Sequence, residues 1–284
     1  MSTFVQRAFR HWADHSTGTG MLARSVRRVA LRLAHGGYRV GNIAMLHAGR
    51  CGSSVLADLL NQHPDVRWAN EPFEGMKPAY YRMNSEHRAY HVIANRMYAQ
   101  KAKYFGFDSK YLPEQHLRPE LANKTPEEYI RLLKRLGFGH FVLLDRRNHL
   151  RRAVSVAIGT RDGQWNSFKA VGATSPVRLD PERFISYGAS MPLLDYFRSL
   201  ETTYEGLKAC LAGSRVLELT YEDDIQGGPH LGYWKCCDFV GMPRAPVDVR
   251  LKKLNERPVS GLIENFSDVV ATLYGTPYEW MLRE

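Results

Sequence analysis

The chain has 284 residues, of which 44% are hydrophobic and 24% charged, so its composition excludes an intrinsically disordered or fibrous protein and indicates a folded one. The 39 Lys and Arg residues outnumber the 29 Asp and Glu residues, and the formal charge of +10 favours phosphate-bearing ligands, nucleic acid or anionic membranes as partners. No apolar run reaches the roughly 18 residues that a transmembrane helix needs.

Four cysteines in a chain of this length, two of them adjacent, resemble neither a disulfide framework nor a metal site. They are Cys51, Cys210, Cys236 and Cys237. The N-terminus also lacks the continuous apolar core of a secretory signal. We therefore expect a cytoplasmic protein.

Residues 1–38 are strongly basic, with Asp14 as their only acid. Apolar residues recur in this segment at helical spacing opposite several arginines, which predicts a basic amphipathic helix. The apolar positions are Leu22, Val26, Val29 and Leu33. Such a helix can contact a membrane peripherally, act as an organelle presequence, or pack on the protein with a solvated basic face, and these interpretations stay open. Residues 39–284 are expected to form one domain.

Apolar segments that alternate with helical ones predict an open parallel sheet flanked by helices, a P-loop-like α/β fold. The main strands are expected at residues 39–47, 141–145 and 215–221, with shorter ones at 66–69 and 103–108. Helical periodicity follows at residues 53–62 and returns after the second main strand and near the C-terminus. Two aperiodic stretches, residues 74–100 and 160–195, are interpreted as lids and acceptor-binding loops.

The segment "HAGRCGSS" (residues 47–54) joins the first strand to its helix. A helix N-terminus with unpaired amides attracts anions, and glycines let a phosphate approach the backbone closely. Arg50 adds a cation, while Ser53 and Ser54 can donate to phosphate or cap the helix. Gly52 stands where a Walker loop requires Lys, which argues against kinase chemistry. The alternative is a Gly-rich connection with a Ser N-cap.

The second motif, "RRNHLRRAVS", starts at the carboxyl end of the second main strand, on the same edge of the sheet as the first loop. Arg147 lies at the strand end and Ser155 about two helical turns later, so both can grip one terminal phosphate. By itself an Arg-rich helix is more often a solvated face.

Together these motifs resemble the sulfotransferases that use 3′-phosphoadenosine 5′-phosphosulfate (PAPS). The segments "AGRCGSSVLADLLNQHPDV" and "NEPF" are similar to the bacterial trehalose and Nod-factor sulfotransferases, and "RNHLRRAVS" matches the superfamily's Arg-x7-Ser. The resemblance covers about residues 40 to 275. It implies the sulfotransferase fold, transfer of the PAPS sulfonate to a hydroxyl of a carbohydrate or glycolipid acceptor, release of 3′,5′-bisphosphoadenosine (PAP), and no metal.

The resemblance and the chemistry of these segments together assign a donor site. In the first motif it comprises Arg50, Cys51, Gly52, Ser53 and Ser54, and in the second Arg147 and Ser155. Tyr221, in "LTYEDD", is similar to the family's residue near adenine. Lys252, Lys253 and Arg257 are further phosphate candidates, with an exposed basic turn as the equal alternative.

Sulfonate transfer builds up charge on the bridging oxygen of the donor, and Arg50 with the adjacent amides can stabilise it. The resemblance assigns the general base to Glu71; chemistry alone also allows a helix-capping or salt-bridged carboxylate. Lys110 can neutralise sulfonate oxygens, as a similarly placed Lys does in the related enzymes, whereas His116 is interpreted as structural.

The other reactive side chains are given structural roles. His47 and His149 adjoin apolar segments where a hydrogen-bonded histidine is ordinary, and Cys51 has no His or Asp beside it in the sequence to activate a nucleophile. The histidines are scattered, so no metal site is predicted. The alternative function is a non-enzymatic basic protein that binds nucleic acid or an anionic membrane; because no nucleic-acid-binding motif is present, nucleic acid is not an expected partner.

Overall fold

The computed structural model describes residues 38–73, 85–99, 101–112, 125–165, 175–253 and 257–283. The basic helix predicted for residues 1–38 therefore lies outside the described residues except for its last position, and His116 lies outside them altogether. Within the described part of the chain, no helix is both long enough and apolar enough to cross a membrane.

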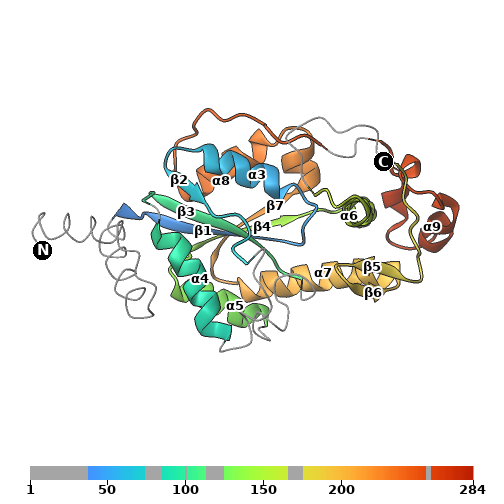
Figure 1. Cartoon of the computed structure of the whole chain (residues 1–284), viewed down its shortest axis with the longest axis horizontal. Coiled ribbons are helices and arrows are strands. Elements are labelled where there is room, and N and C mark those ends of the chain that lie inside the picture. The colour runs from blue at the N-terminus through green and yellow to red at the C-terminus, as the bar shows by residue number, and fades with distance from the viewer. Residues whose placement is uncertain are drawn as a thin grey trace, which may run out of the picture.

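A five-stranded parallel sheet forms the centre of the protein (Figure 1). Its strands, in spatial order, are β2 (Val66–Trp68), β3 (Tyr104–Lys110), β1 (Gly41–His47), β4 (His140–Asp145) and β7 (Arg215–Thr220). All five strands were expected from their apolar runs, because strands covered on both faces are apolar on both faces. The predicted α/β class with an open parallel sheet flanked by helices is confirmed.

Helices cover both faces of this sheet (Figure 1). On β1, Ile43 and Met45 pack toward one face, with α3 and α8, while Ala44 and Leu46 pack toward the other. The helices are α3 (Ser53–Gln62), α4 (Ser85–Ala99), α5 (Pro126–Arg135), α6 (His149–Asp162), α7 (Leu193–Cys210), α8 (His230–Val240) and α9 (Phe266–Leu273). Shorter helical turns are η4 (Glu222–Gln226), η5 (Val259–Gly261) and η6 (Glu279–Leu282).

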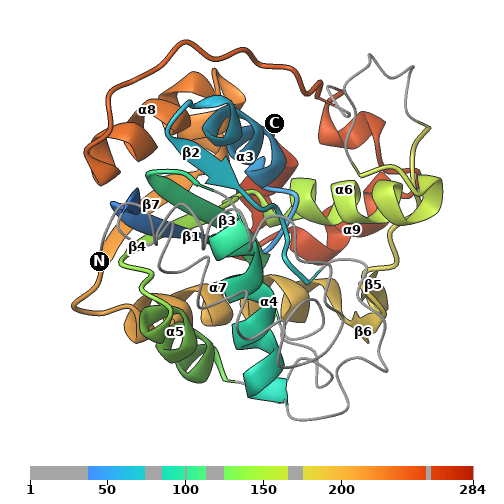
Figure 2. The same ribbon diagram turned by 60° about the vertical axis from the view of Figure 1, so that its left-hand side comes forward.

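Both stretches interpreted as aperiodic loops contain regular structure. Residues 85–99 form α4, on which Ile93, Ala94 and Met97 are buried and Tyr90, Val92 and Tyr98 are partly buried against the core. Tyr90, Ile93, Ala94 and Met97 follow helical spacing, so the interpretation of this segment as an aperiodic loop was wrong. The second stretch contains a hairpin of β5 (Phe184–Ser186) and β6 (Ala189–Met191), which lies beside α7 (Figure 2).

The sheet topology creates a ligand-binding edge. β1 lies between β3 and β4, and its last residue, His47, pairs with Lys110 on one side and Leu144 on the other. The chain leaves β1 through α3 toward β2, and leaves β4 through α6 toward β7. The loops after β1 and β4 therefore diverge, and in open α/β sheets ligands bind in the crevice at such a point.

Gly106 on β3 is a close-packing position inside the sheet. A Cβ added there would lie 2.1 Å from the indole ring of Trp68 on the neighbouring strand. Replacing Gly106 with Ala is expected to lower the free energy of unfolding by about 1 to 3 kcal/mol, because the indole has to move out of a packed core. Urea unfolding measures this change.

Gly139→Ala is the matched control, since no atom lies within 4 Å of the corresponding Cβ. It should change the free energy of unfolding by less than about 0.5 kcal/mol. Equal stability of the two variants would contradict the tight packing of Trp68 against β3.

Candidate active site at the carboxyl edge of the sheet

The loop after β1 has a left-handed backbone at three of its residues. Gly49, Arg50 and Gly52 have φ angles of 82°, 58° and 83°. At Gly52, which precedes the first residue of α3, an added Cβ would also lie 2.6 Å from the side chain of Ile225. The loop thus needs glycine there, and it leads into a helix whose first amides lack intrahelical acceptors.

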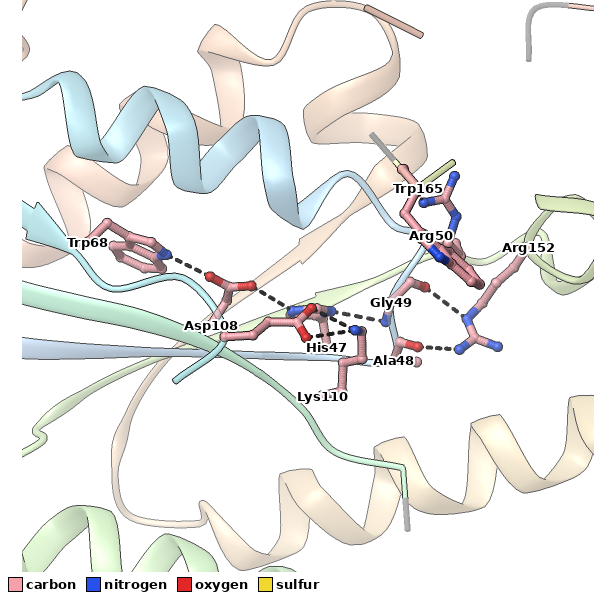
Figure 3. Close-up of polar contacts among 10 residues, drawn as sticks. His47, Ala48, Gly49, Arg50, Trp68, Asp108, Lys110, Arg152 and Trp165 are labelled. Atoms are coloured by element: carbon pink, nitrogen blue, oxygen red, sulfur yellow. Dashed lines mark hydrogen bonds and ion pairs between the residues drawn. The ribbon is translucent and has the colours of Figure 1, made fainter. Parts of the chain in front are cut away.

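Three consecutive carbonyls of this loop accept hydrogen bonds from arginines. The guanidinium of Arg152, on α6, donates to the carbonyl oxygens of Ala48 and Gly49, the latter at 2.9 Å (Figure 3). Arg146 donates to the carbonyl oxygen of Arg50 at 3.1 Å. Arg152 is 1% exposed, so this contact forms inside the protein and fixes the loop against α6.

A chain of buried hydrogen bonds supports the other side of the loop (Figure 3). The amide of Gly49 donates to His47 Nδ1 at 3.0 Å, and His47 Nε2 lies 3.3 Å from Asp108 Oδ2. The indole of Trp68 donates to Asp108 Oδ1 at 2.8 Å. Both ring nitrogens of His47 are thus engaged in holding the loop, in line with its interpretation as structural.

His149 begins α6 and is also buried. Burial, assisted by the charge of Arg152, lowers the pKa of His149 to about 4. Its ring packs against Phe197, at 5.8 Å between ring centroids. This environment is that of a core histidine rather than of a base at the crevice.

Although the histidines are scattered along the sequence, the described residues include one cluster of possible metal ligands. Atoms of His47, Glu71 and Asp108 lie within 4.8 Å of one another. However, His47 and Asp108 already bind each other, and the ammonium of Lys110 lies 2.7 Å from the Glu71 carboxylate. A metal ion would have to displace that ammonium, so these residues do not fit a metal site as they stand.

A first cavity of about 500 Å³ opens between α3, α6 and the segment after β7. Its charged lining side chains are all cationic among the described residues: Arg50, Arg146, Arg151, Lys252 and Lys253. Uncharged lining residues include Ser53, Ser54, Ser155 and Tyr221. A cavity lined by cations without a carboxylate selects for an anionic ligand.

Two hydrogen bonds hold the guanidinium of Arg50. Its Nε donates to Ser155 Oγ at 2.9 Å, and its Nη1 donates to the carbonyl oxygen of Trp165 at 2.6 Å. Burial lowers the pKa of Arg50, and the charge of Arg146 acts in the same direction. An anion that enters the cavity relieves this repulsion.

A second cavity of about 450 Å³ lies on the other side of the loop and has a different character. It is lined by Asp58, Glu71 and Asp108, by the amides Asn61 and Asn70, and by His47, Lys110 and Tyr187. Arg50, Ser53, Ser54, Trp165 and Leu251 line both cavities. The loop after β1 therefore stands at the junction of a cationic cavity and a cavity that holds carboxylates.

The structure distributes the predicted site residues as follows. The first cavity is lined by Arg50, Gly52, Ser53, Ser54, Ser155, Tyr221, Lys252 and Lys253, and the second by Glu71 and Lys110. Cys51 is buried and lines neither cavity, and Arg257 contributes a carbonyl that accepts a hydrogen bond from Arg151. Arg147 is half exposed and pairs with Asp223 at 2.6 Å, outside both linings.

The sequence analysis missed three arginines and several residues around the second cavity: Arg146, Arg151, Arg152, Asp58, Asn61, Asn70, Asp108 and Tyr187. One signal was available for Arg151, because it lies one helical turn before Ser155 and so shares its face of α6. Nothing local distinguishes Arg152, whose role depends on a loop more than 100 residues away.

Comparisons with known proteins do not assign a family to the chain. No protein-family model matches the chain, and no curated protein matches it. Among solved structures, the chain is similar to a sulfotransferase from Alicyclobacillus acidocaldarius, with a TM-score of 0.49 and 15% sequence identity. The similarity covers 85% of this chain and 94% of that chain.

Arg152→Met tests whether the buried guanidinium shapes the anion site. The carbonyls of Ala48 and Gly49 lose their donor, so the free energy of unfolding should fall by about 1 to 3 kcal/mol. Because the loop is released from α6, the affinity for pyrophosphate, used as a simple anion probe, should fall as well. Calorimetric titration measures it.

The matched control is Arg161→Met, which removes a more exposed arginine of the same helix. It should leave pyrophosphate affinity within about twofold of the wild type. If Arg152→Met also left that affinity unchanged, the loop would keep its shape without the guanidinium.

Proposed function

We propose that the protein is a sulfotransferase that moves the sulfonate of PAPS to a hydroxyl of a carbohydrate or glycolipid acceptor and releases PAP. One observation carries the proposal: a cationic cavity and a carboxylate-containing cavity meet at Arg50, Ser53 and Ser54. Group transfer needs such a junction, since an anionic donor must be held on one side while a base acts on the acceptor on the other.

The donor half suits a nucleotide that carries phosphates at both ends. A cavity of about 500 Å³ lies within the range for such ligands. Tyr221 lines this cavity, and the guanidinium carbon of Arg146 lies 4.1 Å from the centroid of the Tyr221 ring. These stacked planar groups suit a flat nucleotide base nearby. Ser155, Lys252 and Lys253 also line this cavity and are the proposed ligands of a terminal phosphate.

Arg147 keeps its proposed role at that phosphate through an exchange of partners. Its guanidinium is half exposed and pairs with the exposed carboxylate of Asp223, while its Nε also lies 3.8 Å from the less exposed carboxylate of Glu222. The exposed ion pair with Asp223 contributes little stability, so a phosphate with more charge can replace that carboxylate.

The transfer step assigns roles to the residues at the junction. The bond between sulfur and the bridging phosphate oxygen breaks, and the acceptor oxygen forms a new bond to sulfur. Arg50 and the first amides of α3 stabilise the charge that the phosphate oxygen gains. Glu71 takes the proton of the acceptor hydroxyl, and Lys110, 2.7 Å from its carboxylate, neutralises the sulfonate oxygens.

The lining of the second cavity favours a sugar as acceptor. Asn61 and Asn70 line it with amide groups that hydrogen-bond to hydroxyls. A cavity lined by amides and ionised side chains is suited to a polyhydroxylated ligand more than to an apolar one.

Glu71→Gln tests the reaction and its base together. Wild-type protein should transfer radiolabelled sulfonate from PAPS to at least one member of a panel containing trehalose and chitin oligosaccharides. The variant should lose transfer by at least about 100-fold, because an amide cannot accept the proton, while binding PAP with unchanged affinity.

Asp58→Asn is the control, since this carboxylate lines the same cavity but is paired with Arg250. It should retain transfer within about tenfold. Full transfer by Glu71→Gln would remove Glu71 from the reaction without affecting the donor site.

A further inference from the structure

Tyr187 occupies a backbone conformation that is unfavourable for its side chain. It is the first residue of the two-residue turn between β5 and β6, with a φ of 50°, and Gly188 follows with a φ of 90°. This type of hairpin turn favours Asn or Gly at the first position, because a bulky side chain is strained at positive φ. Strain of this kind is retained where the side chain has a task.

The hairpin is anchored firmly enough to hold the ring in place. Phe184, at its base, is buried against Tyr196 of α7, at 4.7 Å between ring centroids. The ring of Tyr187 stacks on that of Trp165, at 5.8 Å and an interplanar angle of 18°. Trp165 in turn packs on Gly159 of α6, where a Cβ would lie 2.8 Å from its ring.

A cation lies at each end of this aromatic pair. The guanidinium carbon of Arg50 is 5.6 Å from the Trp165 ring centroid, and the ammonium of Lys110 is 5.8 Å from that of Tyr187. Arg50 lines both cavities, whereas Lys110 and Tyr187 line only the second. The order Arg50, Trp165, Tyr187, Lys110 thus runs across the junction where the sulfonate would pass.

Lys110 therefore has two restraints. Its ammonium lies 2.7 Å from the Glu71 carboxylate and makes a cation–π contact with the ring of Tyr187. A four-carbon side chain has many rotamers, and an aromatic ring in a fixed position reduces the number that it samples. An ammonium that is ordered before the donor arrives binds the sulfonate without a further entropic cost.

We propose that Tyr187 is a positioning residue whose ring holds the Lys110 ammonium at the junction, ready to bind the sulfonate of the donor. This rests on the proposed function, and it adds a residue on the hairpin to the sulfonate-binding group. The strained turn aims the ring, and Trp165 connects it to Arg50, so the two cations that flank the sulfonate are ordered by one aromatic unit.

The test compares PAPS with PAP, its counterpart without the sulfonate. Calorimetric titration of the full chain with each ligand, without acceptor, gives the ratio of the two dissociation constants, and the change in this ratio between wild type and variant reports on contacts at the sulfonate end of the donor. Tyr187→Gly should shift this ratio against PAPS by about three- to tenfold, while the dissociation constant of PAP changes by less than about twofold. Glycine suits the positive φ, so the variant should melt at the wild-type temperature or higher.

Four further variants test this mechanism. Tyr187→Phe should keep the wild-type ratio, because the ring is retained. Lys110→Met should shift the ratio as Tyr187→Gly does, and the double variant should shift it no further than Lys110→Met alone, since Tyr187 acts through Lys110. Ile185→Ala, an exposed position on the same hairpin, should match the wild type.

The outcomes separate the two proposals. The role of Tyr187 would be overturned if Tyr187→Gly left the ratio of the two dissociation constants unchanged, even with both ligands bound more weakly. It would also be overturned if Tyr187→Phe shifted the ratio against PAPS. Either result would leave the donor site intact. Wild-type protein that binds neither ligand would instead contradict the proposed function.

Discussion

The guanidinium of Arg152 donates to the carbonyl oxygens of Ala48 and Gly49 in the protein interior, and the geometry of the whole site depends on this contact. It joins the loop after β1 to α6, the helix that follows β4, so the two diverging segments of the sheet edge become one rigid unit. Because the carbonyls face Arg152, a left-handed loop and the N-terminus of α3 remain for a ligand. The His47 and Asp108 pair holds the same loop from the β3 side.

This arrangement explains how one loop serves two unlike cavities. α6 and the segment after β7 supply cations to one side, while the ends of β1 and β3 and the turn at Glu71 supply carboxylates and Lys110 to the other. The burial of Arg50 between them has an electrostatic cost that a phosphate or sulfonate repays. Charge separation across a rigid loop is the property that favours transfer of an anionic group over simple binding of one.

Local patterns were sufficient for the sheet and for the position of the anion loop, because apolar runs and glycines act through their own neighbours in sequence. The helical spacing of Tyr90, Ile93, Ala94 and Met97 in α4 was overlooked. Local patterns also carry no information on features that depend on distant partners. The Arg147 side chain is oriented by Asp223, 76 residues later, and the Gly49 carbonyl is held by a hydrogen bond from Arg152, 103 residues later. Tyr187 carried no sequence signal either, since its role follows from a strained turn that meets Trp165 and Lys110 only in the folded chain.

In the proposed function, the cationic cavity recognises a nucleotide with phosphates at both ends rather than anions in general. Titration of the full chain with PAP and with 5′-AMP, each at low and high salt, tests it most directly. PAP should bind at least about tenfold more tightly than 5′-AMP and should keep this preference at high salt. Salt screens direct hydrogen bonds and ion pairs in a cavity less than it screens the long-range attraction of a basic surface. Weak binding of both nucleotides that disappears together with rising salt would contradict the proposed function and leave only a basic surface.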